Sequence, residues 1–154
     1  MPPQGAPAKI KPQRPADYLE VLTKAVFQSG MSWRVVEAKW SGFREAFAGF
    51  DPQTIARLTE KDIDRLAEDT RIIRNRRKIE ATVDNAIEML AIEKEFGSIR
   101  AYLRSHAGFE ETVADLHRRF RFVGEMGAYY FLYVVGEPVP PHDQLQAQRG
   151  AKRR

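Results

Sequence analysis

Apolar residues recur at every third or fourth position along most of this chain, which is the spacing of one buried helix face. Leu19, Leu22 and Val26 define a first such face, and Ile79 and Val83 open a longer one. No stretch alternates strictly between apolar and polar residues, and no Asn-Gly turn joins two apolar runs. The pattern therefore predicts an all-α fold of short helices joined by short loops.

Capping residues divide this pattern into separate helices. Ser32 is placed to cap a second helix, which is predicted to carry Val36, Trp40 and Phe43 or Phe47 along one face. Other helix starts and ends are predicted at Asp51-Pro52, at the capping box of Thr59 and Asp62, at Gly97 and at Gly124.

Length and composition narrow the class of protein. A chain of 154 residues with 43% hydrophobic residues can form one domain with a buried core. Its longest apolar run, residues 128–135, is far shorter than the ~20 residues of a membrane-spanning helix. The N-terminus lacks the apolar region of a secretory signal, so we expect a cytoplasmic protein without membrane contact. Because the chain has no cysteine, it has neither disulfides nor thiolate metal ligands.

Charge and proline content predict three parts. Residues 1–15 form a proline-rich leader that we expect to be disordered, residues 16–143 form the folded domain, and residues 144–154 form a basic, disordered tail. Residues 1–16 and 144–154 carry seven basic residues and no acidic one, which leaves the span between them at −3 although the whole chain is at +4.

Two basic clusters stand out within the domain, at residues 71–78 and 118–121. Either cluster alone could be an ordinary solvated surface. Together with the basic ends of the chain they favour a polyanionic partner.

Residues 121–135 carry the clearest functional signal. An arginine-rich, aromatic stretch ends at Gly124, and an almost wholly apolar helix begins directly after it. A glycine at this junction is predicted to adopt a positive φ in a tight turn and to let a ligand approach the backbone. The free N–H groups at the start of the next helix would then hold a phosphate. This pattern is typical of a helix-hairpin-helix, a module that grips DNA by its backbone.

Four motifs, in order along the chain, resemble the type I DNA-3-methyladenine glycosylases of the helix-hairpin-helix superfamily. They are Phe27-Gln-Ser-Gly-Met-Ser-Trp33, residues 43–52, residues 72–79 followed by Asn85-Ala86, and Phe120-Arg-Phe-Val-Gly124. The resemblance covers roughly residues 17–142. It implies an enzyme that flips a methylated base out of double-stranded DNA and hydrolyses its N-glycosidic bond without a cofactor.

The resemblance also implies roles for individual residues. Trp33 would stack on the flipped base, with a place in the core as the alternative, and Gln28 would lie at the pocket wall. Ala25 stands where the family has a glutamate that reads the alkylated base. Backbone phosphate would be held by the hairpin residues Arg121, Val123, Gly124, Glu125, Met126 and Gly127. Further phosphate contacts, or contacts that fix helices together, would come from Arg74, Arg76 and Arg77.

The chain lacks the metal ligands of related enzymes but has a candidate for their catalytic aspartate. The family joins its two termini through zinc held by cysteine and histidine, and a chain without cysteine cannot form that site, so no metal is expected. Other helix-hairpin-helix glycosylases place a catalytic aspartate beyond the hairpin glycine. Asp143 follows Gly124 in this way and is a candidate catalytic residue, with a solvent-facing position as the alternative.

The sequence therefore predicts a monomeric base-excision repair glycosylase for alkylated purines such as 3-methyladenine. A non-catalytic DNA-binding protein that kept the hairpin and lost the base pocket is the alternative. Ala25 favours that alternative, whereas Gln28, Gly30 and Trp33 favour the enzyme. A protein–protein adaptor that uses its tails as contacts is a third, weaker interpretation.

Overall fold

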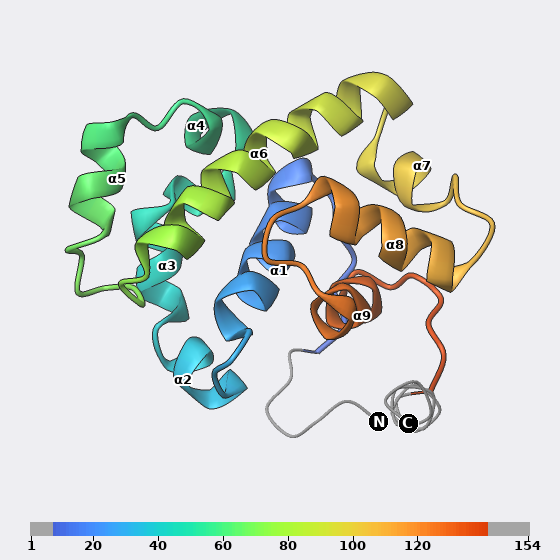
Figure 1. Ribbon diagram of the computed structural model, residues 1–154, viewed down its shortest axis with the longest axis horizontal. Helices are drawn as coiled ribbons and strands as arrows, with labels where there is room; N and C mark the ends of the chain where they lie inside the picture. The colour runs from blue at the N-terminus through green and yellow to red at the C-terminus, as the bar shows by residue number, and fades with distance from the viewer. Residues whose placement is uncertain (1–7, 142–154) are drawn as a thin grey trace.

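The computed structural model of the chain describes residues 8–141, and all regular structure within this range is helical. The all-α prediction is therefore confirmed. The elements, drawn in Figure 1, are α1 (Pro15–Gln28), α2 (Trp33–Ala38), α3 (Trp40–Ala46), η1 (Ala48–Phe50), α4 (Pro52–Ala56), α5 (Glu60–Leu66), α6 (Arg76–Phe96), α7 (Ile99–Leu103), α8 (Phe109–Arg119) and α9 (Glu125–Val134).

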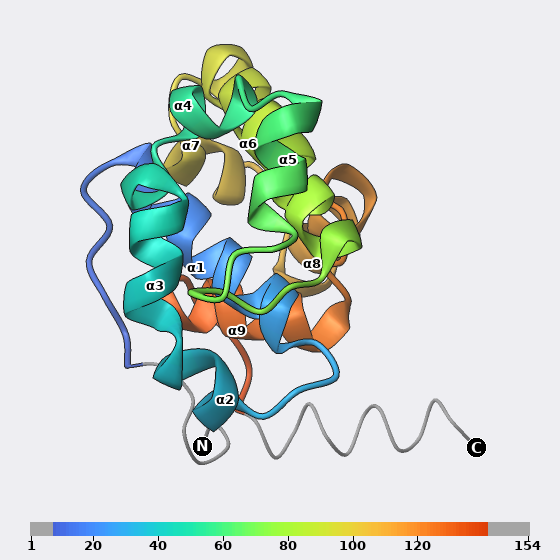
Figure 2. The ribbon, with the colours of Figure 1, turned by 90° about the vertical axis from the view of Figure 1, so that its left-hand side faces the viewer.

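The long helix α6 crosses the whole molecule and organises the fold (Figure 1). It packs against α1, α4, α5 and α7, while α1 packs against α9. The helices α2–α5 gather on one side of α1, and α7–α9 lie on the other (Figures 1 and 2). The face of α1 predicted to be buried is confirmed, because Leu19, Leu22 and Val26 are fully enclosed in the core.

Local signals placed most helix ends correctly. The Asp51 carboxylate accepts the Thr54 N–H at 3.1 Å, and the Thr59 N–H donates to Asp62 at 2.8 Å. These contacts satisfy N–H groups that a helix start leaves free. At the other end of α6, Gly97 adopts a left-handed conformation with φ +87°, which terminates the helix.

The predicted length of the second helix was wrong. Ser32 does cap a helix, since its hydroxyl accepts the Val35 N–H, but Lys39 separates α2 from α3. The two tryptophans on either side of this break lie in different clusters. Trp40 stacks on Phe43 in the main core at 4.7 Å between ring centroids, whereas Trp33 packs against α9.

Residues 8–14, part of the predicted leader, lie against the domain. The Ile10 N–H donates to the Val134 carbonyl at 2.7 Å, and Pro12 is buried. The boundaries at residues 15 and 143 stay predictions. Within residues 8–141, no helix has the length and hydropathy that a membrane crossing requires.

A buried polar network joins α7 to α8, the helix that leads into the hairpin. Asp115 accepts hydrogen bonds from the Tyr102 hydroxyl at 2.8 Å and from His106 Nε2 at 3.0 Å, and it pairs with Arg118. Burial alone would raise the pKa of Asp115. The hydrogen bonds from His106, Tyr102 and Arg118 outweigh burial and lower this pKa to about 2.

The lowered pKa of Asp115 predicts acid sensitivity of the fold. An aspartate in the unfolded chain has an ordinary pKa of 3.8, so the stabilisation is complete above that value and is lost as the pH falls towards 2. The contribution is about 2 kcal/mol. We expect urea unfolding of the wild-type protein to require less denaturant at pH 3 than at pH 5. In Asp115→Asn the difference should shrink, and an equal difference in both proteins would contradict the assignment.

Candidate nucleic-acid interface and base pocket

The turn between α8 and α9 is held by side chains of two helices, the buried Asn85 of α6 and the exposed His117 of α8. The Asn85 amide accepts the Arg121 N–H at 2.8 Å and donates to the Arg121 carbonyl at 3.1 Å, and it is only 1% exposed. From α8, His117 Nδ1 donates to the Val123 carbonyl at 2.9 Å. The turn thus keeps its shape through three bonds to its own backbone, contributed by two different helices.

Removal of the Asn85 amide is expected to loosen this turn. In Asn85→Ala the backbone N–H and carbonyl of Arg121 lose their partner, at a cost of up to about 1–3 kcal/mol for each group left unsatisfied. We expect a lower free energy of unfolding by urea titration. Amide hydrogen exchange should accelerate at residues 121–124. Exchange confined to α6, with an unchanged turn, would show that Asn85 does not act as a clamp.

The prediction of a positive φ at Gly124 was wrong. Gly124 has φ −86°, and the left-handed residue of the turn is Phe122 at φ +59°. The two hydrogen bonds to Arg121 and the bond to Val123 hold the chain on either side of Phe122 in this unfavourable conformation. Gly124 instead leaves the backbone open to a ligand, because a Cβ built at this position would meet no atom within 4 Å.

The first turn of α9 leaves backbone donors free. The first helical bond of this segment runs from the Ala128 N–H to the Gly124 carbonyl at 2.9 Å. Among residues 8–141, no side chain caps this end. The N–H groups of residues 125–127 are therefore open to an acceptor, and the helix dipole favours an anionic one.

A cavity of about 310 Å³ lies between this helix start and the end of α1. Ala25 and Gly127 meet here, since a Cβ on Gly127 would lie 4.0 Å from the Ala25 Cβ. The volume falls in the range of small-molecule pockets. The lining residues are Ala25, Gln28, Ser29, Gly30, Phe122, Gly124, Glu125, Met126 and Gly127.

The cavity wall at α1 is held in place by a lysine of the first basic cluster. Lys78 is buried, and its Nζ donates to the Phe27 carbonyl at 3.1 Å and to the Ser29 carbonyl at 2.7 Å. Burial lowers the pKa of Lys78. This lysine therefore supports the loop after α1 from inside and is not available to bind phosphate.

Glu125 is the only charged side chain among the residues that line the cavity. It is half-buried and makes no hydrogen bond or ion pair with residues 8–141. Gln28 donates its amide N–H to the Met31 carbonyl at 2.8 Å, which orients the amide and leaves its oxygen without a partner in the same range. The cavity thus offers one carboxylate and one amide oxygen as acceptors.

Trp33 lies beside the cavity and does not line it. It is 6% exposed and packs edge-on against Tyr130, with ring centroids 5.4 Å apart. Met126 packs against the cluster of Trp33, Tyr129 and Tyr130 and also lines the cavity, so this side chain joins the cluster to the cavity wall. The indole N–H of Trp33 is buried without a partner in the described range. Its stacking role stays a prediction.

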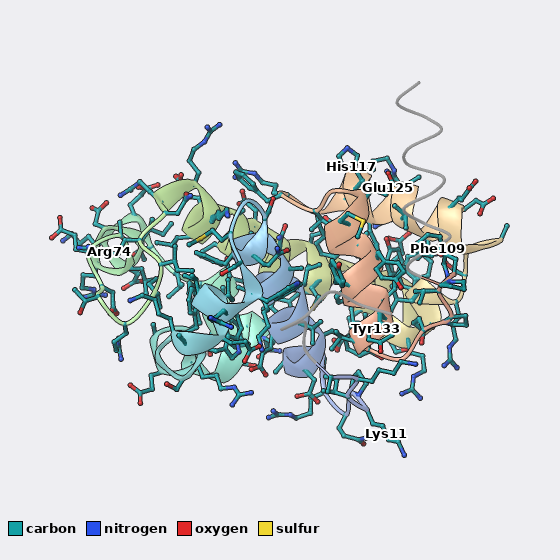
Figure 3. All side chains as sticks on the ribbon, turned by 90° about the horizontal axis from the view of Figure 1, so that it is seen from below. Lys11, Arg74, Phe109, His117, Glu125 and Tyr133 are labelled. Atoms are coloured by element: carbon teal, nitrogen blue, oxygen red, sulfur yellow. The ribbon has the colours of Figure 1, made fainter. Side chains whose placement is uncertain are left out.

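The predicted arginines divide into paired and unpaired groups. Arg76 pairs with Asp64 at 2.7 Å and with Glu60 at 3.1 Å, which ties α6 to α5. Arg121 pairs with Asp84 at 2.5 Å. Arg74 and Arg77 are exposed, and no ion pair to either is found within residues 8–141. Figure 3 shows Arg74 at one end of the molecule, well apart from His117 and Glu125.

Asp143 and His142 lie outside the described residues, so the catalytic role of Asp143 stays a prediction. Within residues 8–141, no group of three or more histidine, aspartate or glutamate side chains is arranged to hold a metal ion. The chain also lacks the cysteines of the zinc site that the resemblance implies. The residues present do not fit that metal.

Several residues of this site were not singled out from the sequence. Phe122 lines the cavity and is 40% exposed, and His117 bonds to the Val123 carbonyl from the last turn of α8. An aromatic residue between an arginine and a glycine is a weak signal for such a position. No spacing in the sequence pointed to the pairing of Asn85 with Arg121, because 36 positions separate them.

The fold and site define an all-helical protein with a clamped turn beside a cavity of about 310 Å³. Comparisons with known proteins give its family. The profile of the methyladenine glycosylase family matches residues 11–119. The chain is 42% identical over 130 residues to DNA-3-methyladenine glycosylase 1 of Escherichia coli, covering 71% of this chain and 70% of that protein. Identity to DNA-3-methyladenine glycosylase of Haemophilus influenzae is 35% over 130 residues, with the same coverage.

Solved structures give the same result. 3-Methyladenine DNA glycosylase I from Staphylococcus aureus superposes with a TM-score of 0.73 at 25% identity, covering 84% of this chain and 80% of that chain. A variant of 3-methyladenine DNA glycosylase I in complex with 3-methyladenine gives a TM-score of 0.72 at 25% identity, covering 84% and 81%. The chain belongs to the methyladenine glycosylase family.

Proposed function

We propose that this protein is a DNA glycosylase that releases cationic alkylated purines, 3-methyladenine above all, from double-stranded DNA. The observation that carries the proposal is the cavity of about 310 Å³ in which Glu125 is the single charged lining residue. A carboxylate in a partly buried cavity favours a positively charged ligand over a neutral one. Methylation at N3 gives an adenine that positive charge while it is attached to the sugar.

The hairpin supplies the grip on the DNA backbone. The free N–H groups of residues 125–127 donate to a phosphate, and the open backbone at Gly124 lets it approach. The Glu125 carboxylate would repel that phosphate if it pointed at the DNA backbone. Its place in the cavity wall supports a role toward the base in place of the predicted phosphate contact.

The flipped base would enter the cavity between α1 and α9. The Gln28 amide oxygen is free to accept a hydrogen bond from the amino group of an adenine. Glu125 would face the positive charge of the alkylated base. Phe122, exposed at the cavity wall, can fill the gap that the flipped base leaves in the stack. Met126 joins this wall to the aromatic cluster that contains Trp33.

The chemical step is hydrolysis of the N-glycosidic bond. Water adds to C1′ of the sugar while the bond between C1′ and N9 of the base breaks. The electron pair of that bond stays on N9 and neutralises the charged base, which leaves as free 3-methyladenine. The water releases one proton to solvent, and the sugar retains a hydroxyl group at C1′. Because the leaving base is already charged, the protein mainly needs to orient the substrate and the attacking water molecule.

The cavity also favours the enzyme over the non-catalytic alternative. A DNA-binding protein without a base pocket has no need for an empty space of this size beside its hairpin, lined by a free carboxylate. We further propose that the protein acts as a monomer in the cytoplasm. The exposed Arg74 and Arg77 would contact phosphates distant from the flipped base.

The proposal is tested by incubating the protein with methylated duplex DNA and measuring released bases by chromatography. We expect release of 3-methyladenine, and duplex affinity that falls steeply between low and physiological salt because phosphate contacts dominate. DNA binding without base release at high enzyme excess would establish the non-catalytic alternative. Absence of salt-dependent DNA binding would contradict both and favour an adaptor.

A further inference from the structure

The arginines of the second basic cluster, residues 118–121, are all paired with carboxylates of the described range. The pairs are Arg118 with Asp115, Arg119 with Glu88, and Arg121 with Asp84. These carboxylates compensate the positive charge of the cluster before any DNA arrives. The sequence predicted that this cluster would attract a polyanion, so the structure leaves open which cation at the turn meets the phosphate.

His117 lies directly before this cluster and has no carboxylate partner. It stands in the last turn of α8 and is exposed. Its Nδ1 atom lies 2.9 Å from the Val123 carbonyl, and no other hydrogen bond or ion pair of this side chain is found in residues 8–141. Figure 3 shows His117 at the edge of the molecule. Within residues 117–121 it is therefore the side chain whose positive charge would be uncompensated.

The bond to Val123 determines which ring nitrogen carries the proton of the neutral side chain. A carbonyl oxygen only accepts hydrogen bonds, so Nδ1 is the donor. In the neutral ring Nε2 then has a lone pair and no proton, and it cannot donate to a phosphate oxygen. Only the imidazolium, which is protonated on both nitrogens, can donate from Nε2 while it keeps the bond to Val123.

The His117 ring is held next to the place where a phosphate would approach the hairpin. Val123, its partner, directly precedes Gly124, and the backbone at Gly124 is open. The free N–H groups of residues 125–127 follow on the same turn. A phosphate that accepts from these groups therefore lies beside a side chain that can add a charge-assisted hydrogen bond.

The charged groups around the ring leave this charge available to a phosphate. On its own helix, Arg118 is paired with Asp115, and across the turn Arg121 is paired with Asp84 of α6. From α9, Glu125 lines the base cavity and forms no ion pair with the ring. An anion that binds here would be the first close partner of the imidazolium.

We propose that His117 binds a DNA backbone phosphate beside the hairpin as an imidazolium, so that DNA binding takes up one proton from solvent at this side chain. The inference rests on the proposed function, which places double-stranded DNA at the hairpin. Histidine is the side chain that ordinarily changes its charge between pH 5 and 8. The affinity for duplex DNA should therefore rise as the pH falls through this range.

Nitrogen NMR of the full-length protein without DNA tests the first step. We expect the neutral His117 ring to carry its proton on Nδ1. A neutral ring that is protonated on Nε2 would show that the bond to Val123 is absent, and it would overturn the proposal.

Fluorescence anisotropy with an unmodified labelled duplex tests the contact itself, at pH 6 and pH 8 and constant ionic strength. The wild-type protein should bind about 10-fold more tightly at pH 6, because a charge-assisted contact is gained. His117→Gln should bind equally at both pH values, with the affinity of the wild-type protein at pH 8. His117→Lys keeps the charge and should bind tightly at both. At pH 6, the salt dependence of His117→Gln should be shallower by about 0.9 in log–log slope, which corresponds to one phosphate contact.

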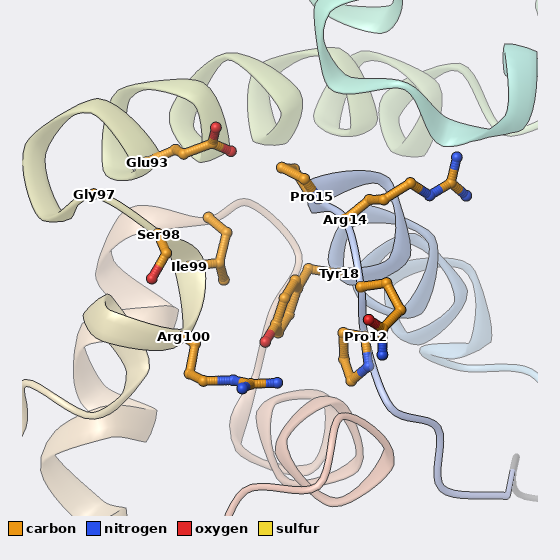
Figure 4. A pocket seen from close by; sticks show the side chains of 10 residues that line it. Pro12, Arg14, Pro15, Tyr18, Glu93, Gly97, Ser98, Ile99 and Arg100 are labelled. Carbon is orange, nitrogen blue, oxygen red and sulfur yellow. The ribbon is translucent and has the colours of Figure 1, made fainter.

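Arg100→Gln is the matched control. Arg100 is exposed and lines a pocket of about 450 Å³ at the other end of α1 from the base cavity (Figure 4). No ion pair to Arg100 is found among the described residues. Its removal takes away an uncompensated charge outside the hairpin, so this variant should keep the full pH dependence of the wild-type protein.

Two further results would overturn the proposal and leave the proposed function standing. If the pH dependence persists in His117→Gln, another group takes up the proton. If His117→Gln loses the same affinity at pH 6 and pH 8, the side chain only shapes the turn. By contrast, DNA binding that does not depend on salt at either pH would overturn the proposed grip on DNA together with this inference.

Discussion

Glu125→Gln is expected to raise KM for 3-methyladenine release about 10- to 100-fold, with a smaller change in kcat. A hydrogen bond or contact to a charged group contributes about 1.5–3 kcal/mol. The positive charge resides on the base before cleavage and moves to the sugar during it. A carboxylate against the base therefore acts mainly when the flipped base is selected, and KM reports that step. Steady-state kinetics on a methylated duplex measure the change.

The control for this prediction removes the same charge from another helix start. Glu110 is exposed in the first turn of α8, as Glu125 is placed in the first turn of α9, but it does not line the cavity. Glu110→Gln should keep the wild-type KM. Equal losses in both variants would mean that overall charge, rather than the cavity carboxylate, controls the reaction.

A second variant moves the carboxylate across the cavity. Ala25 lies on the facing wall, close to Gly127. In the Glu125→Gln background, Ala25→Glu should restore part of the preference for the charged base over a neutral base such as hypoxanthine. If Glu125→Gln leaves that preference unchanged in a folded protein, the assignment of Glu125 is wrong.

Gly124→Val is expected to reduce duplex DNA affinity about 10- to 100-fold while the fold is retained. The φ of −86° suits any residue, and a Cβ at this position meets no protein atom within 4 Å. The open space is where a phosphate would approach the free N–H groups of α9, and a branched side chain would exclude it. Hydrogen bonds from backbone donors to a charged phosphate justify a loss of this size.

The control for Gly124 is a graded series in which Ser is compared with Val. Serine at the N-cap suits a helix start and is small, so Gly124→Ser should weaken DNA binding less than Gly124→Val. Unfolding temperatures should remain close to that of the wild-type protein for both. Wild-type affinity for the valine variant would exclude the Gly124 backbone from the DNA interface.

Local features of the sequence determined the helices and most of their ends. The caps at Asp51 and Thr59 and the left-handed Gly97 act within one helical turn, so their partners are a few positions away and can be recognised without a structure. The buried face of α1 follows from the same local periodicity. The family could also be recognised, because its motifs keep their order along the chain.

Only the tertiary structure decided which residues share a site. Ala25 and Glu125 line one cavity although 100 positions separate them, and Asn85 shapes a turn 36 positions away. The charged clusters read alike in the sequence, but Lys78 turns inward, Arg76 pairs with α5, and Arg74 remains exposed. The two helices on either side of Lys39 likewise place Trp33 and Trp40 in separate clusters. Packing between segments that are distant in the sequence determines which side chains become partners. The spacing of residues along the chain does not indicate these partners.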